Sequence, residues 1–179
     1  MQAPVEPKAD LIEAVQPLIP ALRRYARGLL RDRDDADDLV QDALERAMTR
    51  WHQRHAKGSV RAWLFAIVHN LAIDQLRRRL RRGTPADIDT VPEAALSIPP
   101  EQEAAMRQGD ILLLVALLPA EQRSVLLLIG VEDLSYAEAA AVLDIPQGTV
   151  MSRLSRARER LRRMMEDAPA SSPALRIVK

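Results

Sequence analysis

Apolar side chains recur every three to four residues along most of this chain, which is the spacing of one face of an α-helix. In the first half, the pattern predicts helices over about 11–31, 34–51 and 60–82. Two prolines interrupt the first of these early, and Asp34 or Asp35 can cap the second. The residues between the second and third helices are polar and are expected to form a loop.

The second half follows the same helical pattern from about Gly109 to Glu166. Breaks are expected at Pro119, over 130–135 and over 144–146, where turn-forming residues gather. The pattern therefore predicts a unit of several short helices rather than one long helix.

The stretch 83–107 has the composition of a linker, with four prolines, five acidic residues and neither Lys nor Arg between Thr84 and Met106. We therefore expect an all-α fold of two small helical domains joined by a flexible acidic linker. The expected boundaries are a disordered N-terminus at 1–10, a first domain at 11–82, the linker at 83–107, a second domain at 108–167 and a disordered tail at 168–179.

Composition supports the all-α prediction and narrows the function classes. Glycine is scarce, at 6 residues, which disfavours an all-β fold built on tight turns. The chain has no cysteine, and its three histidines do not cluster with carboxylates at a metal-binding spacing, so neither a metal nor another cofactor is expected. We find no paired nucleophile and base and no glycine-rich phosphate loop, so an enzyme is not expected.

No targeting or membrane segment is predicted. The N-terminus lacks an apolar signal region, and no apolar run approaches the ~18 residues that a membrane span needs. We therefore expect a cytoplasmic protein without membrane insertion.

The net charge of +1 conceals a strong separation of charge along the chain. Five arginines lie within 77–82 and six within 153–163, whereas acidic residues gather within 32–42. Arginine suits phosphates and base edges because its planar fork donates two parallel hydrogen bonds. One such run could equally solvate a helix end, but two runs, each closing an apolar helix, favour a polyanionic partner.

The second domain carries the pattern of a helix-turn-helix. Ser135 and Glu138 have the spacing of a capping box, in which each side chain accepts the backbone amide of the other residue. Residues 144–146 form a tight break, and Pro146 suits the first position of the next helix. A short capped helix, a three-residue turn and a basic helix are typical of this DNA-binding motif.

The basic helix has two distinct faces at about 100° per residue. Its predicted core positions are Val150, Leu154, Ala157 and Leu161. The opposite face holds Ser152, Ser155, Arg156 and Glu159, flanked by Arg153, Arg158, Arg160 and Arg162. Small polar residues with one arginine suit a helix that reads a groove, and the flanking arginines suit phosphates. An ordinary helical hairpin with an arginine-rich surface is the alternative.

The helix over 60–82 carries a second candidate surface. Its stripe of Trp63, Asn70, Asp74, Arg77 and Arg81 combines an aromatic ring, an amide and guanidinium groups. Stacking, edge hydrogen bonding and phosphate contact are the means by which proteins hold unstacked bases. For Trp63 alone, a place in the core is the alternative, since it lies among Leu and Ile residues.

Three motifs occur in order along the chain: DLVQD at 38–42, WLFAIVHNLAID at 63–74, and LP at 118–119 followed by SYAEAA at 135–140 and GTVMSRLSRAR at 148–158. Each is modest alone, and together, over about 11–163, they resemble the extracytoplasmic-function sigma factors, which give RNA polymerase its promoter specificity. The loop before Trp63 lacks the aromatic residues usual in that family.

The resemblance implies a role for each domain. The first would bind the clamp helices of the polymerase β′ subunit and melt the minus-ten element, with Asn70 and the loop 55–61 capturing a flipped base. The second would bind the β flap and read the minus-thirty-five element. The implied polymerase contacts are Asp38, Leu39, Gln41 and Asp42.

The candidate DNA-binding residues combine the resemblance with the helix faces. Those for the minus-ten element are Lys57, Trp63, Asn70, Asp74, Arg77, Arg78 and Arg81. Those for the minus-thirty-five element are Thr149, Met151, Ser152, Arg153, Ser155, Arg156 and Arg158.

We therefore expect a sigma factor that partners core RNA polymerase and promoter DNA, in a stress or envelope response under an anti-sigma factor. In the family the linker threads the polymerase channel, and its acidity matches the charge of nascent RNA; a plain spacer is the alternative. Two other functions stay open: a free-standing helix-turn-helix regulator, and a sigma-like decoy for an anti-sigma factor.

Overall fold

The computed structural model describes residues 7–53, 59–81 and 113–167, and every regular element within them is helical, which confirms the all-α prediction. The first half contains helices α1 (Pro7–Val15), α2 (Ile19–Leu30), α3 (Arg33–Arg50) and α4 (Val60–Arg81), with short 3-10 turns η1 (Gln16–Leu18) and η2 (Trp51–Gln53). The second half contains α6 (Ala120–Gly130), α7 (Tyr136–Leu143) and α8 (Gln147–Asp167). The expected linker at 83–107 and the expected disordered tail at 168–179 lie outside the described residues.

The beginning of the chain differs from the sequence-based expectation in two places. Helix α1 starts at Pro7, so residues 7–10 are helical and not disordered; proline suits a helix start because its missing N–H would have no partner there. The cap of α3 is Asp32, whose carboxylate accepts the Asp35 amide at 2.8 Å, and not Asp34 or Asp35. These two residues lie in the first turn, where the helix dipole favours negative charge.

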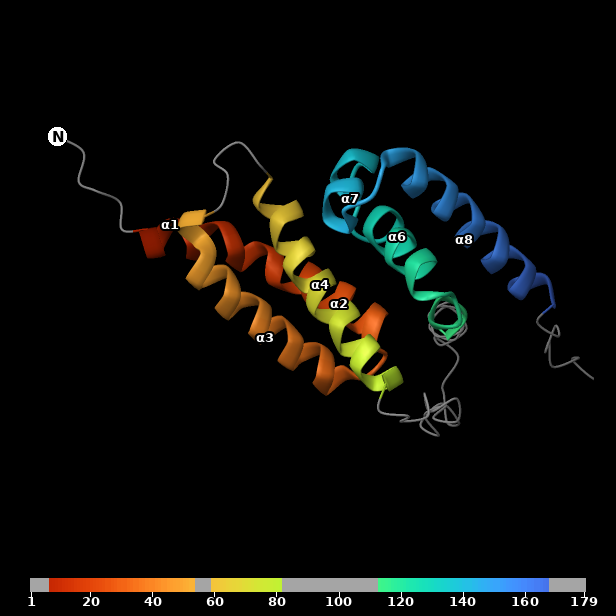
Figure 1. The fold of residues 1–179 in the computed structure, drawn as a ribbon, viewed down its shortest axis with the longest axis horizontal. Coiled ribbons are helices and arrows are strands. Elements are labelled where there is room, and N and C mark those ends of the chain that lie inside the picture. The colour runs from red at the N-terminus through yellow and green to blue at the C-terminus, as the bar shows by residue number, and fades with distance from the viewer. Residues whose placement is uncertain (1–6, 54–58, 82–112, 168–179) are drawn as a thin grey trace, which may run out of the picture.

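Helices α2, α3 and α4 pack against one another and enclose the core of the first half (Figure 1). The ring of Tyr25 meets that of Phe65 edge-on, with centroids 5.4 Å apart, and both side chains are fully buried. Leu22, Leu29 and Val68 surround them without exposure to solvent. The apolar positions at helical spacing therefore form the core that holds α4 in place.

Helices α7 and α8 form the predicted helix-turn-helix, and α6 packs against both of them. The capping box is confirmed: Ser135 Oγ accepts the Glu138 amide, and the Glu138 carboxylate accepts the Ser135 amide. Asp144 ends α7 in the left-handed conformation, at φ 52°, which turns the chain sharply. Helix α8 begins at Gln147, one residue later than the expected start at Pro146.

The two halves also pack against each other. Figure 1 shows α6 and α7 beside α2 and α4, in agreement with the contacts of α2 with α6 and of α4 with α7. Helix α8 lies on α6 and α7 on the side away from the first half. Buried apolar residues from both halves form one cluster, an arrangement that the sequence did not predict.

Candidate nucleic-acid interface

Helix α8 turns one face to the core and the opposite face to solvent, as its sequence predicts. Val150 and Ala157 are fully buried. On the other side Ser152, Ser155 and Arg156 are exposed, and we call these three residues the α8 reading face. Because the serines are small, the helix backbone can lie close to base edges in a major groove while Arg156 reaches further.

Apolar side chains border the α8 reading face. Met151 is 53% exposed, and Tyr136, the first residue of α7, is 36% exposed. Together with Ser155 and Arg158 they line a shallow groove between α7 and α8. The sequence placed Met151 among the candidate residues but missed Tyr136, whose position directly after the capping Ser135 marks the start of a helix. Such an apolar rim suits contact with a thymine methyl group.

Arg153 has a second role that the sequence did not reveal. Its guanidinium pairs with the carboxylate of Glu121 in α6 at 2.8 Å, and its side chain is only 25% exposed. Thr149, in the first turn of α8, is also partly covered. Arg153 therefore fastens α8 to α6, while Arg158 remains exposed on the flank where phosphate contact was expected.

Other arginines of α8 are held by carboxylates of the same helix. Arg162 and Arg163 both pair with Glu159, at 3.1 and 2.8 Å. The hydrogen bonds from these arginines lower the pKa of Glu159. The α8 arginines that form no ion pair within the described residues are Arg156, Arg158 and Arg160.

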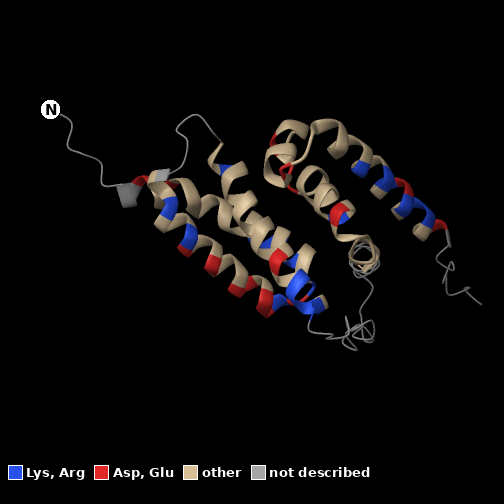
Figure 2. Cartoon of the chain, in the orientation of Figure 1, with Lys and Arg blue, Asp and Glu red and all other residues tan. Residues whose placement is uncertain are grey.

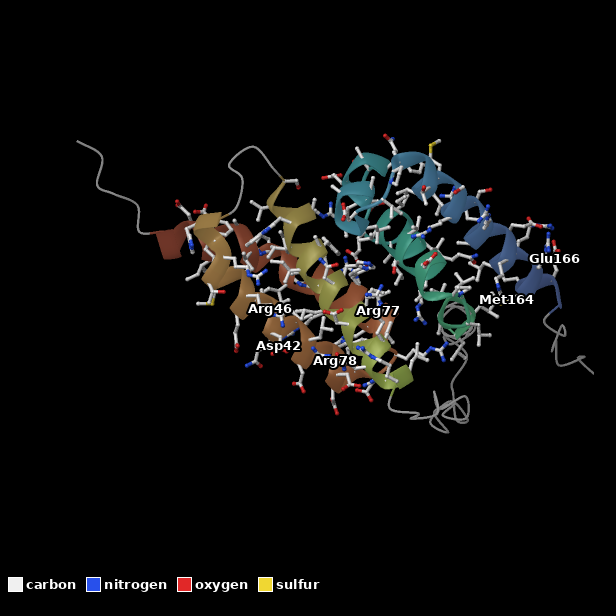
Figure 3. The ribbon with its side chains drawn as sticks, in the orientation of Figure 1. Asp42, Arg46, Arg77, Arg78, Met164 and Glu166 are labelled. Atoms are coloured by element: carbon white, nitrogen blue, oxygen red, sulfur yellow. The ribbon has the colours of Figure 1, made fainter. Side chains whose placement is uncertain are left out.

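The predicted stripe along α4 is exposed over most of its length. We define the α4 stripe as Asn70, Asp74, Arg77, Arg78 and Arg81, all of which are exposed. Figure 3 shows Arg77 and Arg78 near the C-terminal end of α4, where Figure 2 shows positive charge gathering. The amide of Asn70 thus lies on the same helix as a cluster of guanidinium groups.

The N-terminal end of α4 differs from the expectation. Trp63 is partly buried and packs against Trp51, with ring centroids 6.0 Å apart, so it belongs largely to the core, the alternative that the sequence left open. Arg61 lies in the first turn of α4 rather than in a loop, and it donates to the backbone carbonyl of Glu132 in the second domain. Lys57 lies outside the described residues.

Helix α3 presents the residues expected to contact the polymerase. Asp38, Gln41 and Asp42 are exposed, and Figure 2 shows acidic residues along this helix. Figure 3 places Asp42 beside Arg46, so the surface carries both signs of charge. Leu39 is only 4% exposed and packs in the core, so its expected contact with the polymerase is corrected: helical spacing turns it inward.

A buried polar pair lies behind the α4 stripe. Nδ1 of His69, the residue before Asn70, lies 2.9 Å from the hydroxyl of Tyr25. Burial raises the pKa of Tyr25 well above its ordinary value, and a side-chain hydrogen bond with Ser124 of α6 opposes this. Burial, with a contribution from the charge of Arg77, lowers the pKa of His69 to about 4. The imidazole is therefore neutral at pH 7.

This pair predicts an acid-sensitive contribution to stability. We expect the free energy of unfolding to fall by about 1 kcal/mol between pH 7 and pH 5.5 through His69 alone. The pKa of His69 is lower in the folded chain than in the unfolded chain, so the unfolded chain binds the proton first, and stability declines as pH falls from about 6.5 towards 4. Urea denaturation at the two pH values measures this loss. The His69→Gln variant should lose about 1 kcal/mol less stability than the wild type between the two pH values. If the variant loses as much stability as the wild type, the acid sensitivity does not come from His69.

The described residues were also compared with the requirements of a membrane span and of a metal site. None of their helices is long and apolar enough to cross a membrane. They contain no group of three or more His, Asp or Glu residues placed to hold a metal ion.

Two sequence families match the two halves of the chain. Residues 15–69 match the sigma2 domain of PhyR, and residues 108–161 match region 4 of sigma-70. The second match covers α6, α7 and the greater part of α8.

Individual proteins match over most of their length. The ECF RNA polymerase sigma factor EcfG of Rhodopseudomonas palustris (strain TIE-1) is 36% identical over 152 residues, covering 85% of this chain and 81% of that protein. SigM of Mycobacterium tuberculosis (strain ATCC 25618 / H37Rv) is 34% identical over 80% of this chain and 71% of its own. The sigma factor RpoE of Bartonella quintana, solved with the anti-sigma factor NepR, superposes with a TM-score of 0.73 at 34% identity, covering 89% of this chain and 98% of that one. The chain therefore belongs to the ECF family of RNA polymerase sigma factors.

Proposed function

We propose that this protein binds core RNA polymerase and directs it to promoters, with the α4 stripe acting at the minus-ten element and the α8 reading face at the minus-thirty-five element. The observation that carries the proposal is the presence of two separate exposed surfaces suited to nucleic acid on one chain. A repressor would need only the helix-turn-helix to bind DNA, and the α4 stripe would then have no function.

Each surface has its own chemistry. On α8, Arg156 donates two hydrogen bonds to a guanine edge, while Arg158 and Arg160 contact phosphates that fix the position of the helix. On α4, Asn70 binds the edge of an unpaired base, and Arg77 and its neighbours bind the phosphates of the separated strand. This chemistry consists of binding alone and requires no catalysis by the chain.

We propose that α3 binds the polymerase through Asp38, Gln41 and Asp42. Exposed carboxylates and an amide favour a partner surface with complementary charge, and charge complementarity speeds specific association. The relative RpoE was solved with an anti-sigma factor, and we propose a protein of that class as the regulator of this chain. The role places the protein in the cytoplasm, with the polymerase.

Residues 15–69 match the sigma2 domain of PhyR, and PhyR of Bartonella quintana is an anti-anti-sigma factor that was solved with the anti-sigma factor NepR. This match favours a second candidate, a sigma-like protein that sequesters an anti-sigma factor and binds no DNA. Run-off transcription with core polymerase on a promoter library separates the candidates. A sigma factor yields specific transcripts that are absent without it. A decoy yields none but relieves inhibition of another sigma factor by its anti-sigma factor. A repressor shifts duplex DNA tightly without polymerase.

A further inference from the structure

The side chain of Met151 protrudes from α8 between small neighbours. It lies in the second turn of the helix and is 53% exposed. Gly148 precedes it by about one turn, and a Cβ atom placed on that glycine would meet nothing within 4 Å. Ser152 and Ser155 lie next to it on the exposed side of the helix. A base edge that approaches this part of α8 would therefore meet the Met151 side chain with little hindrance from its neighbours.

A second apolar side chain, Tyr136 of α7, lines the same groove as Met151. The buried Leu154 also lines this groove, and Arg158 adds an exposed positive charge that suits a phosphate. Ser155 belongs both to the groove and to the α8 reading face, so the two surfaces are continuous. Duplex DNA that contacts the α8 reading face would therefore also bring base edges to the groove.

We propose that Met151 and Tyr136, which we call the methyl-reading pair, select a thymine in the minus-thirty-five element by its C5 methyl group. The inference rests on the function proposed above and names one base that this surface requires. In the major groove thymine presents a methyl group and an acceptor, whereas cytosine presents an amino donor and no methyl group. Apolar side chains distinguish the two because contact with the methyl group removes apolar surface from water.

The spacing along α8 predicts where this thymine lies relative to the guanine proposed for Arg156. Met151 and Arg156 are five positions apart, which corresponds to about 7.5 Å along the axis of an α-helix. Successive base pairs are about 3.4 Å apart, so the two contacts are separated by about two base-pair steps. Both residues lie in the first half of α8, and the N-terminal part of a recognition helix is the part that contacts base edges.

Removing a single methyl group from the DNA tests the proposal without altering the protein. The promoter library gives the preferred minus-thirty-five element, and each of its thymines is then replaced in turn by deoxyuridine, which pairs in the same way and lacks only the methyl group. We expect replacement at one position, about two base-pair steps from the guanine, to lower run-off transcription about fourfold, because burial of one such group is worth about that factor. An element without a thymine at that distance would overturn the proposal.

Substitutions in the protein assign the effect to the methyl-reading pair. Met151→Ala and Tyr136→Ala should each bring the ratio of transcription from the thymine and deoxyuridine promoters close to one, whereas Met151→Leu should keep the wild-type ratio because leucine is also apolar. The preference for guanine, which depends on Arg156, should persist in all three variants. The matched control is Met165→Ala. Met165 is 51% exposed on the same helix but lies 14 positions further along, about 21 Å from Met151, so its loss should leave the ratio unchanged.

The outcomes separate this inference from the proposed function. If the wild type yields no promoter-specific transcript, the proposed function fails, and the inference that rests on it fails too. If the wild type transcribes its promoter but no deoxyuridine replacement changes the yield, only the methyl-reading pair is overturned. A wild-type ratio in Met151→Ala would also overturn it, since another residue would then contact the methyl group. The wild-type measurement with deoxyuridine does not depend on the folding of any variant.

Discussion

Replacing Arg156 by alanine is expected to cost about 1–3 kcal/mol of promoter discrimination, which is roughly a fivefold to 150-fold loss of transcription from the target promoter. Arg156 is exposed at the centre of the α8 reading face and makes no ion pair within the described residues, so its guanidinium is free to donate to a guanine. Run-off transcription on the wild-type promoter and on promoters with single substitutions in the minus-thirty-five element measures the effect.

The matched control is Arg163→Ala. It removes the same group from the same helix, at a position paired with Glu159. This control should leave promoter preference unchanged, and both variants should keep the unfolding temperature of the wild type within a few degrees. Transcription by Arg156→Ala at the wild-type level would mean that another face of α8 enters the groove.

Replacing Asn70 by alanine should reduce open-complex formation by a similar factor, since a paired amide or a held base is worth about 1–3 kcal/mol. Asn70 is exposed on α4. The preceding residue, His69, faces the other way and lies within hydrogen-bond distance of the Tyr25 hydroxyl. The loss of the Asn70 amide removes hydrogen bonds to the captured base without opening the core. Permanganate footprinting of the promoter bubble, at matched occupancy of the polymerase, measures the melted fraction.

The control for this variant is association with core polymerase, which depends on α3. Asn70→Ala should bind the core enzyme as tightly as the wild type does, whereas Asp42→Ala should weaken that association and leave the α4 stripe intact. A bubble of wild-type extent with Asn70→Ala would remove this residue from the minus-ten site.

The faces of the helices could be predicted because burial follows the helical period. Leu154 and Arg156 differ by two positions and therefore point to different sides of α8, one buried and the other exposed. The same rule predicts that Leu39 is buried, whereas the family resemblance implied that it contacts the polymerase. Periodicity was the better guide at that position.

Caps and long-range contacts were harder to predict. Asp32, Asp34 and Asp35 are all good capping residues, and the sequence does not say which one has the extended backbone that a cap requires. Arg24 and Glu132 are separated by 108 positions and look like ordinary surface charges until the fold brings them together.

One signal for the interface was present in the sequence. Gly28 lies inside a helix, where glycine is unfavourable by about 1 kcal/mol relative to alanine, and a glycine in such a place often marks a close approach. The structure supplies the neighbour, Leu127. The sequence alone could have predicted a contact at Gly28 but not its partner.

The internal ion pairs of α8 limit how strongly salt can control its binding to DNA. A protein that neutralises phosphates releases condensed counterions, and the logarithm of its affinity falls with the logarithm of salt concentration by about 0.9 for each phosphate. If all the arginines from 153 to 163 contacted phosphates, the slope from this helix would approach about −5. Arg153, Arg162 and Arg163 already have carboxylate partners, and Arg156 is proposed to contact a base. Arg158 and Arg160 remain for phosphates, so the contribution of α8 should be nearer about −2. Recognition by this helix therefore tolerates changes in ionic strength better than its arginine content indicates.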